Sequence, residues 1–204
     1  MENKKINNNG HYYVDLGLPS GTLWATMNVG ASKPSDAGLY FQWGDTKGYT
    51  KGQVGKDKQF ASDWSDYKFG ASPNFTKYNA YGASLRKSDD AARAIMGGSW
   101  HIPSPEQIRE LLSNTTNTWT TQDGVNGRLF TSKKDGTKSI FIPAAGYALD
   151  GSVYFRGSDG IVWSSMLHTD YVDFAQNLYF YSDNVYLNDY DLRYYGFSVR
   201  GVVG

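Results

Sequence analysis

The chain has 204 residues, with 20 Lys and Arg residues balanced by 20 Asp and Glu residues, so it has no overall charge that would attract nucleic acid or an anionic membrane. This length suits a single hydrophobic core, and the absence of cysteine excludes disulfides, thiolate metal ligands and cysteine nucleophiles. No apolar run approaches the roughly 18 residues that a membrane span needs, so we expect no membrane insertion.

The N-terminal part is expected to contain short strands joined by turns. Residues 1–10 are polar, which predicts a disordered lead that is neither a signal peptide nor an anchor. Ordered structure is then expected to begin at His11. The apolar-rich runs 12–18 and 22–29 flank a Pro-Ser-Gly turn signal and predict a hairpin. The alternating run 39–43 predicts a third short strand.

A long surface excursion is expected between residues 46 and 83. This stretch is rich in Lys, Gly, Ser, Asp and Tyr and has no periodicity. The aromatic residues that would attach it to the rest of the protein are Phe60, Trp64 and Tyr67. The simplest interpretation of the stretch is an insertion loop.

Two helices are expected in the middle of the chain. Ser88 is a suitable N-cap for a helix over residues 89–96. Ser104 caps a second helix that begins with Pro105, and Gln107 completes a capping-box pattern. The buried face of the second helix is predicted to consist of Ile108, Leu111 and Leu112.

Strands are expected again after the helices. Runs 128–132 and 139–142 are separated by Lys-Lys-Asp-Gly, which predicts a hairpin. Further short strands are predicted at 162–165, 176–181 and 196–203. Strands before and after two central helices indicate a loop-rich α+β domain with antiparallel pairing.

Six phrases in the sequence match one family in order. They are YVDLGLPSGTLWAT at 13–26, NVGA at 28–31, GGSWHIPS at 97–104, FIPAAGY at 141–147, VWSS at 162–165 and GFSVR at 196–200. Together they resemble the Fibrobacter succinogenes major paralogous domain family. The resemblance implies a C-type-lectin-like fold of the formylglycine-generating-enzyme-like subtype, with short antiparallel strands around two helices in a single domain over residues 11–204.

The last quarter of the chain, about residues 166–195, resembles the variable region of a diversity-generating retroelement target protein. The resemblance implies mutation at template adenines, which changes AAC codons but cannot produce Lys, Glu, Gln, Trp or Met from them. Segment 167–195 contains no Lys, Glu, Trp or Met, and Gln176 lies in an apparent framework strand. The candidate display residues are Leu167, His168, Asp170, Tyr171, Asp173, Phe174, Tyr179, Tyr181, Tyr186, Asn188, Asp189, Tyr190, Asp191, Leu192, Tyr194 and Tyr195.

The composition of this segment is also that of a binding surface. Tyrosine provides a large, rigid contact area, while Asn, Asp and Ser adapt their hydrogen bonds to a partner. Five Asp against Arg193 give the segment about four net negative charges, which favours a neutral or basic partner patch. An alternative is that the tyrosines are half-buried strand residues. The irregular order of Tyr, Asp and Asn over 188–195 instead favours an exposed loop.

Catalysis is not expected. The related formylglycine-generating enzymes use cysteine chemistry, and this chain has no cysteine. The three histidines are scattered, and His101 is interpreted as structural. Neither Asp170 with Asp173 nor Asp189 with Asp191 has the ligand number of a calcium loop, so no catalytic residue, cofactor or metal is assigned. A core role is expected for Trp24, Trp43, Trp100 and Trp163.

The sequence therefore predicts a non-enzymatic receptor-binding module with a diversified C-terminal surface, carried by a phage virion or on a bacterial surface. Its expected partner is a cell-surface protein or glycan, and not a nucleic acid. A fixed carbohydrate-binding adhesin of a gut bacterium remains the alternative, and a purely structural virion or surface-layer component is a third class.

Overall fold

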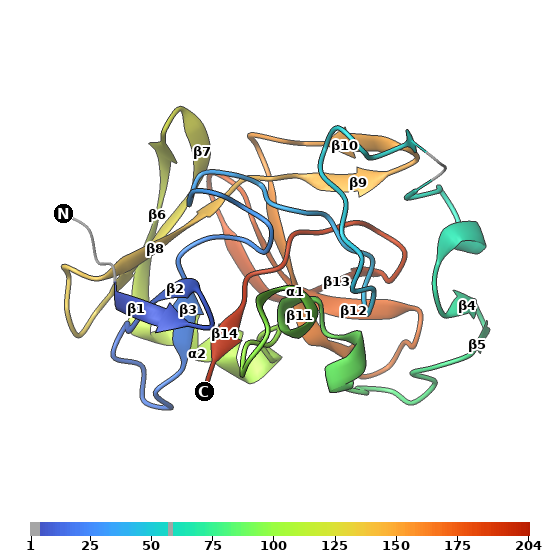
Figure 1. Cartoon of the computed structure of the whole chain (residues 1–204), viewed down its shortest axis with the longest axis horizontal. Coiled ribbons are helices and arrows are strands. Elements are labelled where there is room, and N and C mark those ends of the chain that lie inside the picture. Colours follow the sequence, from blue (N-terminus) through green and yellow to red (C-terminus); the bar gives the residue numbers. More distant parts are fainter. Residues whose placement is uncertain (1–4, 57–58) are drawn as a thin grey trace.

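The computed structural model describes residues 5–56 and 59–204, without the side chains of residues 5–8, 188 and 189. The fold is mixed α/β, with about 12% helix and many short antiparallel strands in small open sheets (Figure 1). The helices whose residues the structure fully describes are η2 (Trp64–Asp66), η3 (Lys87–Asp89), α1 (Ala91–Met96) and α2 (Pro105–Asn114). Among the described residues, no helix combines the length and apolar character that crossing a bilayer requires.

Three of the sheets contain more than two strands. The first has the order β1 (Lys5–Asn8), β2 (His11–Val14), β3 (Leu23–Ala25) and β14 (Val202–Val203). The second consists of β6 (Thr115–Gln122), β7 (Val125–Ser132) and β8 (Ser139–Pro143), and the third of β11 (Gly160–Leu167), β12 (Phe174–Phe180) and β13 (Val185–Leu192). Two hairpins complete the set: β4 (Gly70–Ala71) with β5 (Asn74–Phe75), and β9 (Tyr147–Leu149) with β10 (Ser152–Tyr154).

The N-terminal hairpin is confirmed, and its sheet extends further toward the N-terminus than the sequence indicated. Strands β2 and β3 pair through Tyr13 with Ala25, and Gly21 N donates to Leu18 O at 2.9 Å to close the turn. The predicted disordered lead is wrong from residue 5 onward, because β1 pairs with β2 and thereby finds backbone hydrogen bonds without needing apolar side chains. Residues 1–4 lie outside the described part of the chain.

The expected strand at 39–43 is only partly regular. Tyr40 and Phe41 each form an isolated bridge, to Tyr49 and Phe197 respectively. Adjacent residues therefore pair with different segments, which prevents one continuous ladder. Similarly, only Val202–Val203 of the predicted strand 196–203 is regular.

The two helices occur where they were expected, with one change of cap. Helix α1 begins after Asp90, whose carboxylate accepts from Arg93 N at 3.0 Å, and not after Ser88, which lies in η3. The capping box of α2 is formed as predicted, with Ser104 accepting from Gln107 N and the Gln107 side chain accepting from Ser104 N. Ile108 and Leu111 are buried, and Leu112 is half-buried.

The predicted hairpin at 128–132 and 139–142 is confirmed as β7 and β8, and strand β6 was missed. Strand β6 is a Thr-rich run without a strong apolar face. The turn from β6 to β7 consists of Asp123 and Gly124, both with positive φ (50° and 76°). An Asp-Gly pair of this kind is a strong hairpin signal and could have indicated the strand.

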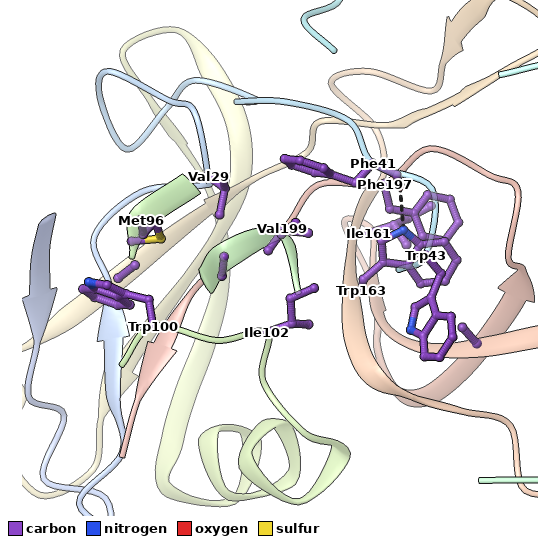
Figure 2. Packing of buried hydrophobic residues seen from close by; sticks show 14 of the residues in the cluster. Val29, Phe41, Trp43, Met96, Trp100, Ile102, Ile161, Trp163, Phe197 and Val199 are labelled. Carbon is purple, nitrogen blue, oxygen red and sulfur yellow. Dashed lines mark hydrogen bonds between the residues drawn. The ribbon is translucent and has the colours of Figure 1, made fainter. Parts of the chain in front are cut away.

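The core contains the four framework tryptophans, as predicted. Trp24, Trp43, Trp100 and Trp163 are at most 1% exposed. Trp163 lies against Phe197 with ring centroids 4.1 Å apart, and its Nε1 donates to Phe41 O at 2.8 Å (Figure 2). The core thus joins the first third of the chain to its C-terminal segment.

Candidate ligand-binding surface

The candidate segment forms most of the β11–β12–β13 sheet. The strands predicted at 162–165 and 176–181 correspond to β11 and β12. The exposed loop predicted for 188–195 is wrong up to Leu192, because Val185–Leu192 is strand β13, paired with β12 along its length. Cross-strand pairing therefore prevails over the irregular polar pattern of this stretch.

An extra residue in β13 reverses which face its side chains occupy. Tyr186 pairs with Tyr179, whereas Tyr190 pairs with Gln176. Positions 176 and 179 lie on opposite faces of β12, because side chains alternate along a strand. Tyr186 and Tyr190 therefore also face opposite ways, although they are four positions apart in the sequence. The register changes around Asn188, which makes this a β-bulge.

The first aromatic group, the ladder patch, consists of Tyr179, Tyr181 and Tyr186. The rings of Tyr179 and Tyr186 are stacked, with centroids 5.8 Å apart and planes at 13°. The hydroxyls of Tyr181 and Tyr186 are 3.1 Å apart, and Asn184 Nδ2 donates to Tyr181 Oη at 3.0 Å. These two hydrogen bonds lower the pKa of Tyr181. Tyr186 is 42% exposed, so the patch is open to a partner.

The second group, the loop patch, consists of His168, Tyr171, Phe174 and Tyr190. His168 stacks on Tyr171 at 5.2 Å and lies 4.2 Å from Tyr190, and Phe174 meets Tyr190 edge to face at 5.5 Å. Tyr171 and Tyr190 are exposed. Tyr81, which is also exposed, lies next in sequence to Gly82, whose N donates to His168 O at 2.9 Å. Sequence reasoning did not include Tyr81.

A third group, the hairpin group, adjoins the ladder patch and lies mostly outside the predicted segment. It consists of Tyr147, Tyr154 and Phe155 together with Tyr195. Tyr147 stacks on Tyr195 at 5.7 Å and 17°, and Phe155 is 60% exposed. Asp159 links this group to the ladder patch, because its carboxylate accepts from Tyr179 Oη at 2.5 Å and its N donates to Phe155 O at 3.0 Å. Tyr147 was not predicted as a surface residue because it lies in the phrase FIPAAGY at 141–147, outside the variable-like segment.

The ladder patch and the hairpin group share an acidic environment. Burial raises the pKa of Tyr147 and of Tyr195, and the nearby Asp191 carboxylate acts in the same direction on both. Asn177 Nδ2 donates to Asp191 Oδ2 at 3.0 Å, while the buried Asn177 Oδ1 has no hydrogen-bond partner in the described structure. The surface therefore offers acceptors and ring faces, which suit a partner rich in donors.

Two predicted display residues lie in the core. Leu167 is 0% exposed and packs with Trp163 and Ala175. Tyr194 is 8% exposed and meets Trp64 at 4.7 Å. Their side chains are enclosed, so they support the surface and do not reach a ligand.

The other predicted residues are distributed around the two patches. Asp170 is exposed, and Asp173, Phe174, Asp191 and Leu192 are half-buried. One Asp173 oxygen is buried without a partner among the described residues. Asn188 and Asp189 lie in β13, but their side chains fall outside the described part of the structure.

The excursion at 46–83 packs against this region through its aromatic residues, as predicted. Phe60 and Tyr67 are buried and Trp64 is half-buried, and Tyr67, Phe69 and Phe75 form one cluster with Tyr194. The aromatic residues expected to hold the excursion thus do contact the body of the protein.

Arg193 ties the excursion to the candidate segment. It is fully buried, and its guanidinium lies 3.9 Å from the Phe75 ring centroid. It donates to Tyr67 Oη at 3.0 Å and to the backbone oxygens of Lys77, Tyr78 and Val172 at 3.3, 3.0 and 2.9 Å. A residue within the variable-like segment therefore has a structural role.

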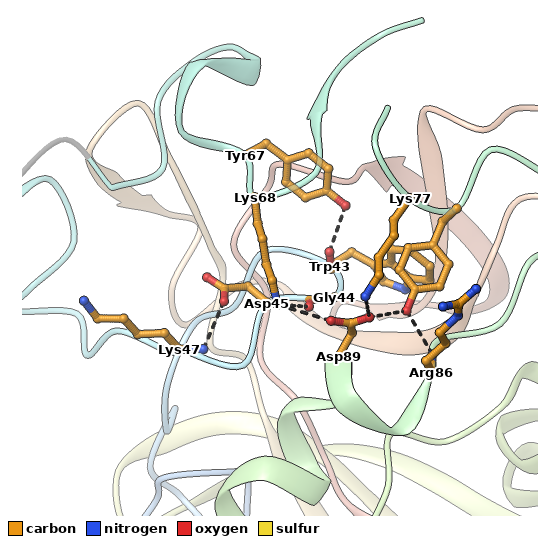
Figure 3. A network of polar contacts seen from close by, with 10 residues as sticks. Trp43, Gly44, Asp45, Lys47, Tyr67, Lys68, Lys77, Arg86 and Asp89 are labelled. Carbon is orange, nitrogen blue, oxygen red and sulfur yellow. Dashed lines mark hydrogen bonds and ion pairs between the residues drawn. The ribbon is translucent and has the colours of Figure 1, made fainter. Parts of the chain in front are cut away.

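A second polar network fixes the end of the excursion against η3. The buried Asp89 carboxylate accepts from Lys77 Nζ at 2.6 Å, from Tyr78 Oη at 2.6 Å and from Lys68 Nζ at 3.3 Å (Figure 3). Burial opposes ionisation, but these hydrogen bonds outweigh it and lower the pKa of Asp89. Next to this network, Tyr67 Oη donates to Trp43 O at 2.9 Å and Lys68 Nζ donates to Gly44 O at 3.3 Å, so this part of the excursion is also attached to the backbone at 43–44.

Within the described residues, no group of three or more His, Cys, Asp or Glu side chains is placed to hold a metal ion. His101 is half-buried, with Nδ1 3.0 Å from Ser99 O and Nε2 3.4 Å from Gln107 Nε2, as a structural histidine would be. No family model matches the chain, and no match was found among curated proteins or among solved structures.

Proposed function

We propose that this protein is a receptor-binding module that displays a diversified aromatic surface on a C-type-lectin-like scaffold. The observation that carries the proposal is where the exposed aromatic residues lie. Of the eight large hydrophobic side chains that are exposed among the described residues, five lie between residues 154 and 190. Clustered exposed aromatics usually mark interaction sites.

The principal contact surface in this proposal is the ladder patch together with the hairpin group. Tyr179 connects the two through Asp159. The rings are already packed against one another, so a partner would meet a preorganised surface and lose little side-chain entropy on binding. The carboxylates of Asp159 and Asp191 favour a partner that is neutral or basic. Presentation at a phage or bacterial surface, and an origin in a diversity-generating retroelement, belong to the same proposal.

The test compares single variants, because the β13 bulge places two exposed tyrosines on different patches. Labelled wild-type protein is titrated onto intact cells of a panel of gut bacteria, alongside Tyr186→Ala for the ladder patch and Tyr190→Ala for the loop patch. A central tyrosine contributes about 2 kcal/mol, so Tyr186→Ala should weaken saturable binding roughly 30-fold.

Tyr12→Ala is the matched control, since Tyr12 is 45% exposed and lies in the N-terminal sheet. Its binding should equal that of wild type. Wild-type affinity in both Tyr186→Ala and Tyr190→Ala would refute the site, and the absence of saturable binding to every strain would refute the receptor-binding function.

A genomic observation distinguishes the diversified module from a fixed carbohydrate-binding adhesin. A near-repeat of the 3′ end of the gene that differs only at adenines supports diversification. Its absence, together with competition of cell binding by free monosaccharides, supports the adhesin.

A further inference from the structure

A polar pocket of about 280 Å³ lies between the turn after Trp43 and the first part of the excursion. It is lined by two carboxylates (Asp45, Asp66), two carboxamides (Gln42, Gln59), two rings (Tyr49, Phe60) and one ammonium group (Lys47). The pocket carries one net negative charge. None of these residues belongs to the ladder patch, the loop patch or the hairpin group, so the pocket is not part of the proposed receptor-binding surface.

Both carboxylates are held in place through one oxygen only. Lys47 N donates to Asp45 Oδ1 at 3.1 Å, and Gln42 Nε2 donates to Asp66 Oδ1 at 3.0 Å. Gln42 is itself only 5% exposed, so it fixes Asp66 from inside the protein. The second oxygen of each carboxylate accepts no hydrogen bond from the residues that the structure describes, which leaves two oriented acceptors.

Gln59 supplies a third acceptor. Its Oε1 atom is buried and has no hydrogen-bond partner among the described residues. A buried oxygen without a donor is unfavourable, because it has lost its hydration without replacement. A ligand that brings a donor to this oxygen would remove that penalty.

The aromatic wall of the pocket is fixed. The rings of Tyr49 and Phe60 meet edge to face at 5.8 Å, and Lys47 Nζ lies 5.2 Å from the Tyr49 ring centroid. Phe60 has a φ of +56°, a conformation that bulky residues rarely adopt, and its oxygen accepts from Gly151 N at 3.0 Å. Packing thus holds Phe60 in a strained position beside the carboxylates.

We propose that this pocket binds a primary ammonium group. An ammonium carries three N–H donors, and the pocket lining offers three oxygens that lack a donor, one each on Asp45, Asp66 and Gln59. Its charge complements the net negative charge of the pocket, and the aromatic wall adds cation–π attraction. The contact of Lys47 Nζ with Tyr49 is an example of such attraction at the rim.

A calcium ion fits the same pocket less well. Calcium takes about six to eight oxygen ligands, usually with several carboxylates. This pocket has two carboxylates, and the described residues contain no larger acidic or histidine cluster. The ammonium group could come from a free small amine or from a lysine side chain of a polypeptide, and both sources present the same chemistry.

The test is an NMR titration of the full chain with n-butylamine at neutral pH. We expect saturable shifts confined to the resonances around residues 42–49 and 59–66. The matched ligand n-butanol, which lacks the charge, should produce none. Tetramethylammonium, which keeps the charge but lacks N–H donors, should bind at least tenfold more weakly than n-butylamine. A blocked tripeptide with a central lysine distinguishes the sources, since its binding alongside butylamine would show that the pocket admits a polypeptide side chain.

The variants test the carboxylates without changing the shape of the pocket. Asp45→Asn and Asp66→Asn should each weaken butylamine binding at least tenfold, while Asp63→Asn, a neighbouring exposed carboxylate outside the pocket, should leave it unchanged. Equal shifts with butylamine and butanol, no saturable binding at millimolar concentrations, or unaltered binding in both variants would overturn the proposal. The comparison of butylamine with butanol on the wild-type protein is decisive by itself, so the result does not depend on whether the variants fold. It is also independent of the receptor-binding proposal.

Discussion

A single buried guanidinium joins three parts of the chain behind the candidate surface. Arg193 contacts Tyr67 and Tyr78 in the excursion and Val172 before β12, and no carboxylate pairs with it among the residues that the structure describes. Hydrogen bonds to backbone oxygens and nearby rings replace the water that its charge has lost. This role could not be predicted from the sequence, because Arg193 lies in an acidic segment among residues that were expected to be exposed.

Replacement of Arg193 by Met should therefore destabilise the protein. The change leaves Tyr67 Oη and three backbone oxygens without their donor, for an expected loss of about 2–4 kcal/mol in the free energy of unfolding. Urea denaturation followed by tryptophan fluorescence measures it. The control is Arg156→Met, an exposed residue whose replacement should change stability by no more than about 0.5 kcal/mol. Equal stability of the two variants would show that the buried contacts contribute nothing.

Asp89 makes the stability depend on pH in a defined direction. Its folded pKa lies below the ordinary value of 3.8, so the folded protein binds fewer protons than the unfolded chain in acid. The stability that Asp89 contributes is present above about pH 3.8 and is lost as the pH falls through the folded pKa. Asp89→Asn should thus cost about 1–3 kcal/mol near neutral pH, and less in acid.

Urea denaturation of wild type and Asp89→Asn at pH 7 and pH 3 checks this expectation. Asp15→Asn serves as the control, because Asp15 is exposed and its side chain accepts only a local bond from Gly17 N at 2.8 Å in the described structure. A difference between wild type and Asp89→Asn that stays constant between the two pH values would contradict the assignment.

At the scale of elements, the sequence predicted best where the signals are local. The Ser104 cap, Pro105 and Gln107 lie within one turn of α2, and the structure forms all of their predicted contacts. The turn at Gly21 and the β7–β8 hairpin are equally local. Strand β13 was missed because its bulge breaks the two-residue alternation on which strand prediction depends.

The capping box makes a direct prediction for α2. Ser104→Ala removes the hydroxyl that accepts from Gln107 N and should cost about 1 kcal/mol of stability. Ser113→Ala, at an exposed position near the end of the same helix, should change stability by less than about 0.5 kcal/mol. Thermal unfolding followed by circular dichroism compares the two variants, and an equal loss in both would show that the cap is not the cause.

At the scale of the whole molecule, the features that could not be predicted from the sequence are contacts between segments that lie far apart in the chain. The mixed architecture was predictable from the order of the sequence patterns, and the burial of the four tryptophans was predicted from their place in the framework of the family that the sequence resembles. The stacking of Tyr147 on Tyr195 and the cluster of Phe75 with Tyr194 join distant segments, and no periodicity indicates such partners. For the same reason, Leu167 could not be recognised as a core residue from its place in a variable-like segment.

The first and the last strand of the described chain belong to the same sheet. Strands β1 and β14 are the two edges of the N-terminal sheet, with β2 and β3 between them (Figure 1). Residues near both ends thus stabilise the same layer, while the excursion, the β9–β10 hairpin and the β11–β13 sheet form the region that carries the proposed binding surface.

The bulge at Asn188 restricts how this segment can change in evolution. A substitution at any exposed position of β13 leaves the alternation of faces intact. An insertion or deletion of one residue would exchange the inward and outward positions on one side of the change, burying Tyr or Asp side chains and exposing Leu187 or Val185. The fold of this segment is therefore compatible with many different side chains but with only one length. Natural variants of the segment should differ by substitutions and not by insertions or deletions.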